Sequence, residues 1–155
     1  MELLKLIAMD RDDLEVVSTH LQDSNVKASE ILWRPRENRV VIALDRFDWE
    51  AANGKTPHWQ RRRTALRFDR VLACKGRNLS EAKAEQVFNL IGVHFSPKDA
   101  PGGTVTLMFS DGAALRLEVE CLEVEVADLG PVWVCDKCPD HSADEAAFES
   151  RLRRA

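Results

Sequence analysis

The sequence predicts one α+β domain dominated by a curved, mainly antiparallel sheet, either a sandwich or a half-open barrel, with two short helices. Three observations carry this prediction: the length of one ordinary domain, short apolar segments separated by turn residues, and two longer segments whose alternation breaks midway. With 155 residues, 45% hydrophobic and 31% charged, the chain can bury a core without disulfides or metals. Its formal charge of −4 argues against an overall electrostatic attraction of the chain to nucleic acid or to anionic membranes.

Helices are predicted in three places. Residues 12–22 form the first, because acids after Asp10 suit a helix N-terminus and Leu14, Val17 and Leu21 recur at helical spacing. Residues 81–88 form a second short helix, with Ser80 as its N-cap. A weak helix over 143–153 lies in a mobile C-terminal tail, 134–155, so that the domain itself spans 1–133.

Apolar segments bounded by turn residues predict the strands. They span residues 26–34, 39–47, 64–75, 89–95, 104–109 and 113–126, and residues 1–9 form a strand that enters the fold. The segment Val40–Leu44 is apolar on both faces, which is typical of a central strand. Ser110-Asp111-Gly112 predicts a tight hairpin turn. Leu129-Gly130-Pro131 is expected to end the regular pattern.

Two of these strands are expected to bend. In 113–126 the apolar residues change phase after Cys121, which requires a bulge or a sharp bend, and in 64–75 the break falls at Asp69-Arg70. Ala65–Asp69 also resembles Ala114–Glu118, and each half of the chain is predicted as helix, strand, strand, strand. One interpretation is a duplicated α-β-β-β unit. The other is a single α+β domain with a chance similarity.

Charges gather on the same two strands. Arg61, Arg62 and Arg63 begin a basic stretch that continues to Arg77, whereas residues 111–128 are mainly acidic. If the strands lie side by side, the two sets pair across them. The alternative is a nucleic-acid contact through the Arg61–Arg63 cluster, with Trp59 as a stacking aromatic.

A binding site is predicted where the strand 39–47 ends. Phe47 and Trp49 share one phase beside charged residues, and Trp and Arg are common in binding hot spots. The candidate binding residues are Arg46, Phe47, Trp49, Trp59, Arg61 and Arg63. The alternative is that the aromatic side chains cover the end of the core and Arg46 pairs with an acid.

The C-terminal cysteines are the candidate metal ligands. Cys135 and Cys138 have CxxC spacing and His141 follows, so the three could hold part of a zinc site. A structural zinc site needs four ligands and the chain has no second CxxC pair, so no cofactor is predicted and zinc is the alternative. Cys74 and Cys121 lie in apolar segments and are expected to pack like small hydrophobic residues.

Several motifs resemble one known family. The segments Glu30–Pro35, Arg46–Glu50, Val87–Ile91 and Leu117–Val124 resemble an uncharacterised alphaproteobacterial family, the domain of unknown function 2948, over residues 3–133. Asp45 stands where Asn is expected, and the residues after Trp133 do not match the pattern. The resemblance implies a small bacterial cytoplasmic protein and supplies no activity.

The sequence therefore predicts a small non-enzymatic binding module of the cytoplasm. No GxSxG, GxGxxG or Walker motif is present. The partner is an unidentified protein or small molecule; nucleic acid and membranes are disfavoured, and a homodimer is left open. Two alternatives remain: a metal-binding protein or metalloenzyme that uses Cys135, Cys138 and His141, and nucleic-acid binding through Arg61–Arg63.

Overall fold

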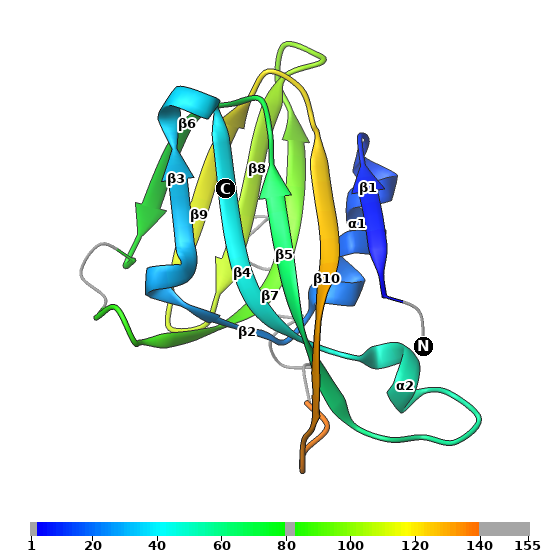
Figure 1. The fold of residues 1–155 in the computed structure, drawn as a ribbon. Helices are drawn as coiled ribbons and strands as arrows, with labels where there is room; N and C mark the ends of the chain where they lie inside the picture. The colour runs from blue at the N-terminus through cyan, green and yellow to red at the C-terminus, as the bar shows by residue number, and fades with distance from the viewer. Residues whose placement is uncertain (1–2, 80–82, 140–155) are drawn as a thin grey trace.

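A curved antiparallel sheet of ten strands forms the protein in a computed structural model (Figure 1). The structure describes residues 3–79 and 83–139. The elements, in chain order, are β1 (Lys5–Ala8), α1 (Arg11–Leu21), β2 (Ser24–Lys27), the 3-10 turn η1 (Ala28–Glu30), β3 (Ile31–Arg34), the 3-10 turn η2 (Pro35–Glu37), β4 (Arg39–Phe47), α2 (Trp49–Ala52), β5 (Gln60–Phe68), β6 (Val71–Arg77), β7 (Val87–Pro97), β8 (Gly103–Phe109), β9 (Ala114–Val119) and β10 (Val124–Val134). This confirms the predicted α+β class with its curved antiparallel sheet.

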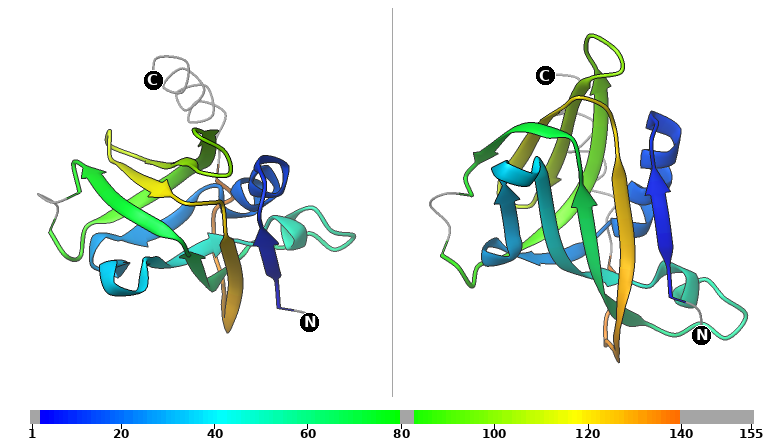
Figure 2. Two further views of the ribbon diagram at one scale, coloured as in Figure 1. Left: turned by 90° about the horizontal axis from the view of Figure 1, so that it is seen from above. Right: turned by 45° about the horizontal axis from the view of Figure 1, so that its top comes forward.

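The strand order shows two meanders that exchange their last strands. The order is β1-β10-β5-β4-β2-β7-β8-β9-β6, with β3 beside β4. Thus β3-β4-β5 and β7-β8-β9 are each consecutive neighbours, while β6 leaves β5 to pair with β9 and β10 leaves β9 to pair with β5. Within the described residues β3 and β6 do not pair, so the sheet curls without closing (Figure 2).

Helix α1 packs on the inner side of the curved sheet. Asp10 caps it by accepting a hydrogen bond from the backbone N–H of Asp13 (2.8 Å), as the acidic start of the helix predicts. Its buried stripe is Leu14, Val17 and Leu21, and it contacts β7, β1 and β4. No helix in the described part of the chain is long and apolar enough to cross a membrane.

The core lies inside the curve, where alternate residues of each strand are buried. Val40, Ile42 and Leu44 point inward from β4, and Leu66 and Phe68 from β5. On the opposite side the core is completed by Leu90, Val93, Val105, Leu107, Leu115 and Leu117. Since every second residue faces outward, each strand also contributes to an outer surface.

Both predicted bends are present, and they create the strand exchange. The segment 64–75 breaks at Asp69-Arg70 into β5 and β6, where Arg70 adopts a left-handed φ of 60°. The segment 113–126 breaks between Val119 and Val124 into β9 and β10. The predicted cross-strand charge pairing follows in part, because Arg67 pairs with Glu125 and Arg70 with Glu123 (3.6 Å).

Other local predictions are corrected. The segment 26–34 is not one strand, because η1 separates β2 from β3. Of the predicted helix 81–88, residues 83–86 form a turn and 87–88 begin β7, while Ser80 and the predicted helix 143–153 lie outside the described residues. The connection from β4 to β5, for which no helix was predicted, begins with the single turn of α2, capped by Asp48. Since no described residue between β6 and β7 is helical, the repeat seen is a three-stranded meander.

The strand β10 also continues beyond its expected end. Leu129-Gly130-Pro131 forms a bulge in which Gly130 has a φ of +111°, a conformation that suits glycine. Pairing with β5 resumes at Val132 opposite Arg62 and runs to Val134 opposite Gln60. The two strands therefore extend below the rest of the sheet as a ribbon (Figure 1).

Candidate functional site

The predicted site residues meet at one end of the sheet, where β4, α2 and the start of β5 lie together. In the β4–β5 register, Arg46 is opposite Arg62 and Phe47 is opposite Arg61. Trp49 begins α2 directly after β4, and Trp59 directly precedes β5. The structure thus brings the predicted residues into one region, but it gives them different surroundings.

Arg46 is buried and paired. Its Nε and Nη2 donate to Asp128 Oδ1 and Oδ2, each at 2.8 Å, in a bidentate ion pair across β5. Thr64 Oγ1 and the backbone N–H of Leu4 donate to the same carboxylate, both at 2.8 Å. Burial would raise the pKa of Asp128, but the hydrogen bonds, above all those from Arg46, outweigh it and lower this pKa. Asp128 therefore joins β4, β5, β10 and the entry to β1.

A second buried ion pair lies beside the first. Asp48 Oδ2 accepts from Arg62 Nε and from Gln60 Nε2, each at 2.7 Å, and Oδ1 accepts from the backbone N–H of Ala51 at 3.0 Å. Burial would raise the pKa of Asp48, but these hydrogen bonds lower it from 3.8 to about 2. The cross-strand pair Arg46 and Arg62 is tolerated because each guanidinium has its own carboxylate.

Phe47, Trp49 and Arg61 form a small cluster outside the main core. The rings of Phe47 and Trp49 meet edge to face at a centroid distance of 4.6 Å, and the Arg61 guanidinium lies 5.8 Å from the centre of the Phe47 ring. Arg61 Nη1 also donates to the carbonyls of Asp23 (3.0 Å) and Asp45 (3.1 Å). Trp49 Nε1 donates to the carbonyl of Gln22. This cluster fixes α2 against the end of β4.

Arg63 is likewise bound within the chain. Its Nη1 donates to Asp45 Oδ1 at 3.0 Å and its Nη2 to Glu30 Oε1 at 2.5 Å. The guanidinium groups of the basic cluster therefore interact with acceptors within the chain. Arg62 pairs with a buried carboxylate, Arg63 pairs with two half-buried carboxylates, and Arg61 contacts two backbone carbonyls and the Phe47 ring. Few donors are left for a phosphate backbone.

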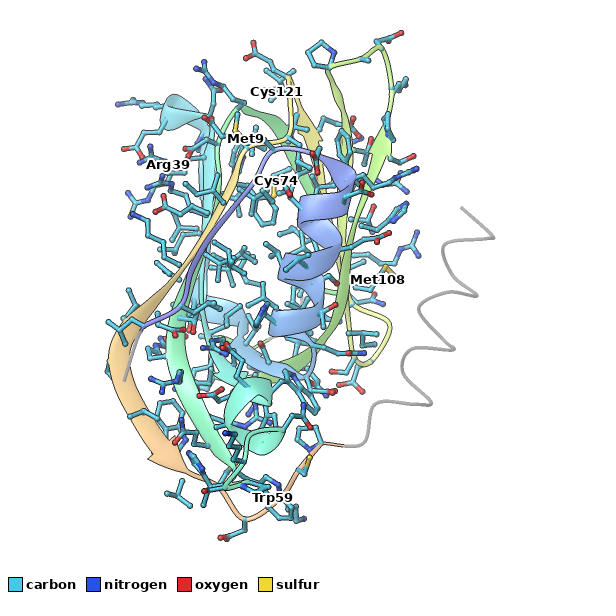
Figure 3. All side chains as sticks on the ribbon, turned by 90° about the vertical axis from the view of Figure 1, so that its right-hand side faces the viewer. Met9, Arg39, Trp59, Cys74, Met108 and Cys121 are labelled. Carbon is cyan, nitrogen blue, oxygen red and sulfur yellow. The ribbon has the colours of Figure 1, made fainter. Side chains whose placement is uncertain are left out.

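Trp59 is the predicted residue with the most exposed ring. Its side chain is 42% exposed, and the backbone N–H of Cys135 donates to its carbonyl, which extends the β5–β10 ribbon. On the facing strand Val132, Trp133 and Val134 are 41%, 39% and 81% exposed. These four residues are called the apolar tip below. Figure 3 shows Trp59 at the lower end of the molecule.

The second edge of β10 is open beside this tip. β1 pairs with β10 only from Val124 to Ala127, so within the described residues no strand covers the edge of Val132–Val134. Sequence reasoning missed these three residues, because it ended the strand at the Gly-Pro bulge. The uninterrupted apolar run Val132-Trp133-Val134-Cys135 after Pro131 was the available signal.

The C-terminal cysteines do not converge with other ligands in the part of the chain that the structure describes. Cys135 and Cys138 are free thiols, and their sulfur atoms donate to the nearby carbonyls of Lys137 and Pro139. Among residues 3–79 and 83–139 there is no group of three or more His, Cys, Asp or Glu side chains that could hold a metal ion. His141, the third candidate ligand, lies outside the described residues.

Comparison with known proteins identifies the family without adding an activity. No curated protein and no solved structure matches the chain significantly. The model of one family of proteins of unknown function, DUF2948, matches residues 4–141. The match continues past Trp133, where the sequence pattern was expected to end, and so includes the apolar tip and the CxxC pair. The chain therefore belongs to the DUF2948 family.

Proposed function

We propose that this protein is a non-enzymatic binding module that recognises an extended apolar segment of another protein through the apolar tip. The observation that carries the proposal is the exposure of Trp59, Val132, Trp133 and Val134 on a strand pair whose outer edge is open. Exposed groups of large apolar residues mark interaction sites, and an open strand edge can hydrogen-bond an added strand.

The alternation along the edge fits an extended partner. Val132 and Val134 project from one side of β10 and Trp133 from the other, opposite Arg61. A strand added at this edge would therefore contact apolar side chains on both faces. The bulge at Gly130-Pro131 limits the added strand to the last residues of β10, because proline has no N–H to donate.

The base of the tip is held in place by buried hydrogen bonds, which favours binding. Gln60 and Arg62 are buried directly opposite Val134 and Val132, and both donate to Asp48. A preformed strand loses less conformational entropy on binding than a flexible loop does. The residues predicted as a site around Arg46 and Phe47 would thus hold the tip in place. Of the predicted binding residues, Trp59 is the one that would contact the partner.

The experiment compares three purified chains. Val134→Glu changes a side chain that is 81% exposed and should leave the fold intact, while placing a charge on the proposed edge. Leu72→Ala is the matched control, because Leu72 is 58% exposed on β6, at the far edge of the sheet. Proteins that co-purify with the wild type are identified, expressed and titrated against all three chains by calorimetry.

We expect a partner that binds the wild type and Leu72→Ala equally, and Val134→Glu at least about tenfold more weakly. Equal affinity for Val134→Glu would refute the tip as the binding surface. Native mass spectrometry and heparin chromatography of the same samples test the alternatives. One metal ion per chain, lost in Cys135→Ser, would favour the metal site. Salt-sensitive retention on heparin, lost in Arg63→Gln, would favour nucleic acid.

A further inference from the structure

A second surface lies on the outer face of the sheet, away from the apolar tip. There β3, β4, β5 and β10 lie side by side, and their residues line an open hollow of about 490 Å³. Its floor is Val41, Ala65 and Ala127, one residue from each of three neighbouring strands. Figure 3 shows Arg39, at the rim, toward the opposite end of the molecule from Trp59.

The hollow exists because small residues coincide across the strands. Ala43, Ala65 and Ala127 are in register on β4, β5 and β10, so three short side chains form one row. In the next row, Arg67 and Glu125 are long and rise above the floor. Alanine is a poor strand former, and residues on the outer face are not constrained by packing in the core. The alanine row therefore has no evident role in stabilising the sheet.

The rim carries a concentration of guanidinium groups. Arg34 of β3 is directly opposite Arg39 of β4, and Arg67 of β5 is opposite Val41, two residues further along β4. Arg39 Nε and Arg67 Nε both donate to Asp69, at 2.7 and 3.0 Å. Arg34 makes no ion pair or side-chain hydrogen bond with any described residue. Like charges directly opposite each other destabilise a sheet unless an anion lies between them.

The two acids at the rim restrict what can bind. Glu37 lies 3.7 Å from Arg39, and Glu125 pairs with Arg67 and Lys5. Their carboxylates would repel a second negative charge placed on the floor. The arrangement therefore suits one anionic group at the arginine end and an uncharged body over the alanines, and it does not suit a polyanion.

We propose that this hollow binds a small organic anion that has one carboxylate or phosphate group and an apolar body. The anionic group accepts hydrogen bonds from Arg34, beside Arg39 on the next strand and Arg67 one strand further on. The apolar body lies on Val41, Ala65 and Ala127. Guanidinium forks match both anionic groups, and the volume is in the range of small-molecule sites, roughly 300–1,000 Å³.

The test is a titration of the full chain, labelled with ¹⁵N, with naphthyl phosphate as the probe. Chemical shifts of the backbone amides of Val41, Ala65 and Ala127 are the readout. Inorganic phosphate and naphthol are titrated in parallel as the anion alone and the apolar body alone. Arg34→Gln removes the unpaired cation, and Lys75→Gln is the matched control, because Lys75 is an exposed cation opposite Arg116 on β6 and β9.

We expect saturable shifts of the floor amides with naphthyl phosphate, about tenfold weaker affinity in Arg34→Gln, and no change in Lys75→Gln. Ala65→Leu should fill the floor and abolish binding while the spectrum stays folded, because Ala65 faces away from the core. The proposal is overturned if no saturable shift occurs at the floor, or if Arg34→Gln binds like the wild type. It is also overturned if inorganic phosphate or naphthol binds as tightly as naphthyl phosphate.

Discussion

Replacing Asp48 by asparagine should destabilise the fold strongly at neutral pH. The side chains of Asp48 and Arg62 are each 5% exposed, and their Oδ2 and Nε atoms are 2.7 Å apart. Asparagine has nearly the same size but no charge, so the buried Arg62 guanidinium would lose its ion pair with Asp48. Removing one partner of a buried ion pair costs about 3–5 kcal/mol. We expect a loss in this range for Asp48→Asn near neutral pH.

The loss should shrink as the pH falls. Burial opposes ionisation of Asp48, but the hydrogen bonds from Arg62 and Gln60 lower its pKa from 3.8 to about 2. The lowered pKa means that the charged form stabilises the fold fully above the unfolded value, and that this contribution disappears as the pH falls toward 2. Since one pKa unit corresponds to about 1.4 kcal/mol, the part that titrates is on the order of 2 kcal/mol.

Urea unfolding followed by tryptophan fluorescence measures the free energy of unfolding of both chains at several pH values between about 7 and 3. It therefore gives the loss at neutral pH and its change with pH. Asp69→Asn is the control, because Asp69 pairs with Arg39 and Arg67, whose side chains are 37% and 42% exposed, and such pairs contribute about 0–1 kcal/mol. The difference between Asp48→Asn and wild type should stay constant from neutral pH to about pH 5 and narrow below that, as Asp48 of the unfolded chain becomes protonated. A difference below about 1 kcal/mol at neutral pH, or one that does not change with pH, would refute the reasoning.

Three further predictions follow from packing and burial. Leu117→Ala should lower the free energy of unfolding by about 2–5 kcal/mol, because Leu117 is fully buried, whereas Leu72→Ala should change it by less than about 0.5 kcal/mol; urea unfolding compares them. Gly103→Ala should cost at least about 1–3 kcal/mol by thermal unfolding, since the added Cβ would lie 2.5 Å from the Ser96 carbonyl oxygen and 2.7 Å from the Phe95 ring. Burial raises the pKa of the Cys74 thiol, so iodoacetamide should modify Cys74 at least about tenfold more slowly than the exposed Cys138; peptide mapping by mass spectrometry measures this.

Local patterns predicted the first helix and the bends of the sheet. The stripe of Leu14, Val17 and Leu21 and the cap at Asp10 are both short-range signals, and the structure confirms them. The change of phase after Cys121 and the charged break at Asp69-Arg70 mark the two bends for the same reason, because a strand cannot change its buried face without one. Periodicity is sufficient wherever one face of an element meets the core.

Local patterns failed where the chain is irregular or is stabilised from a distance. Gly130-Pro131 is a typical strand end, yet β10 continues because β5 supplies partners on both sides of the bulge. The one turn of α2 is too short for a helical stripe and depends on the cap at Asp48. Residues 83–88 have some helical character in sequence, but the backbone N–H groups of Ala28 and Ser29 bond to the carbonyls of Gln86 and Ala84 and hold this segment against η1.

The candidate sites depend on which strands pair and in which register. This pairing cannot be predicted from any single segment of the sequence. That Arg46 and Phe47 lie beside Arg61 and Arg62 follows from the hairpin-like pairing of consecutive strands. That Arg46 binds Asp128, 82 residues away, follows only from the exchange that sends β10 to β5. The floor of the hollow has the same origin, because Val41, Ala65 and Ala127 come from three strands and lie together only in the folded sheet.

Two groups of arginines can be distinguished: those held in buried ion pairs, and those that are exposed and make no ion pair within the described residues. A buried guanidinium must be paired, so Arg46 and Arg62 are committed to Asp128 and Asp48 and cannot also bind a ligand without losing those partners. Arg34 is exposed and unpaired within the described residues, so it can bind an anion at no cost to the fold. Asp128 joins β4, β5 and β10, which carry both the apolar tip and the floor of the hollow. A variant that breaks this pair should therefore weaken both surfaces together, whereas Val134→Glu and Arg34→Gln should each affect one, and that difference separates a binding defect from a loss of structure.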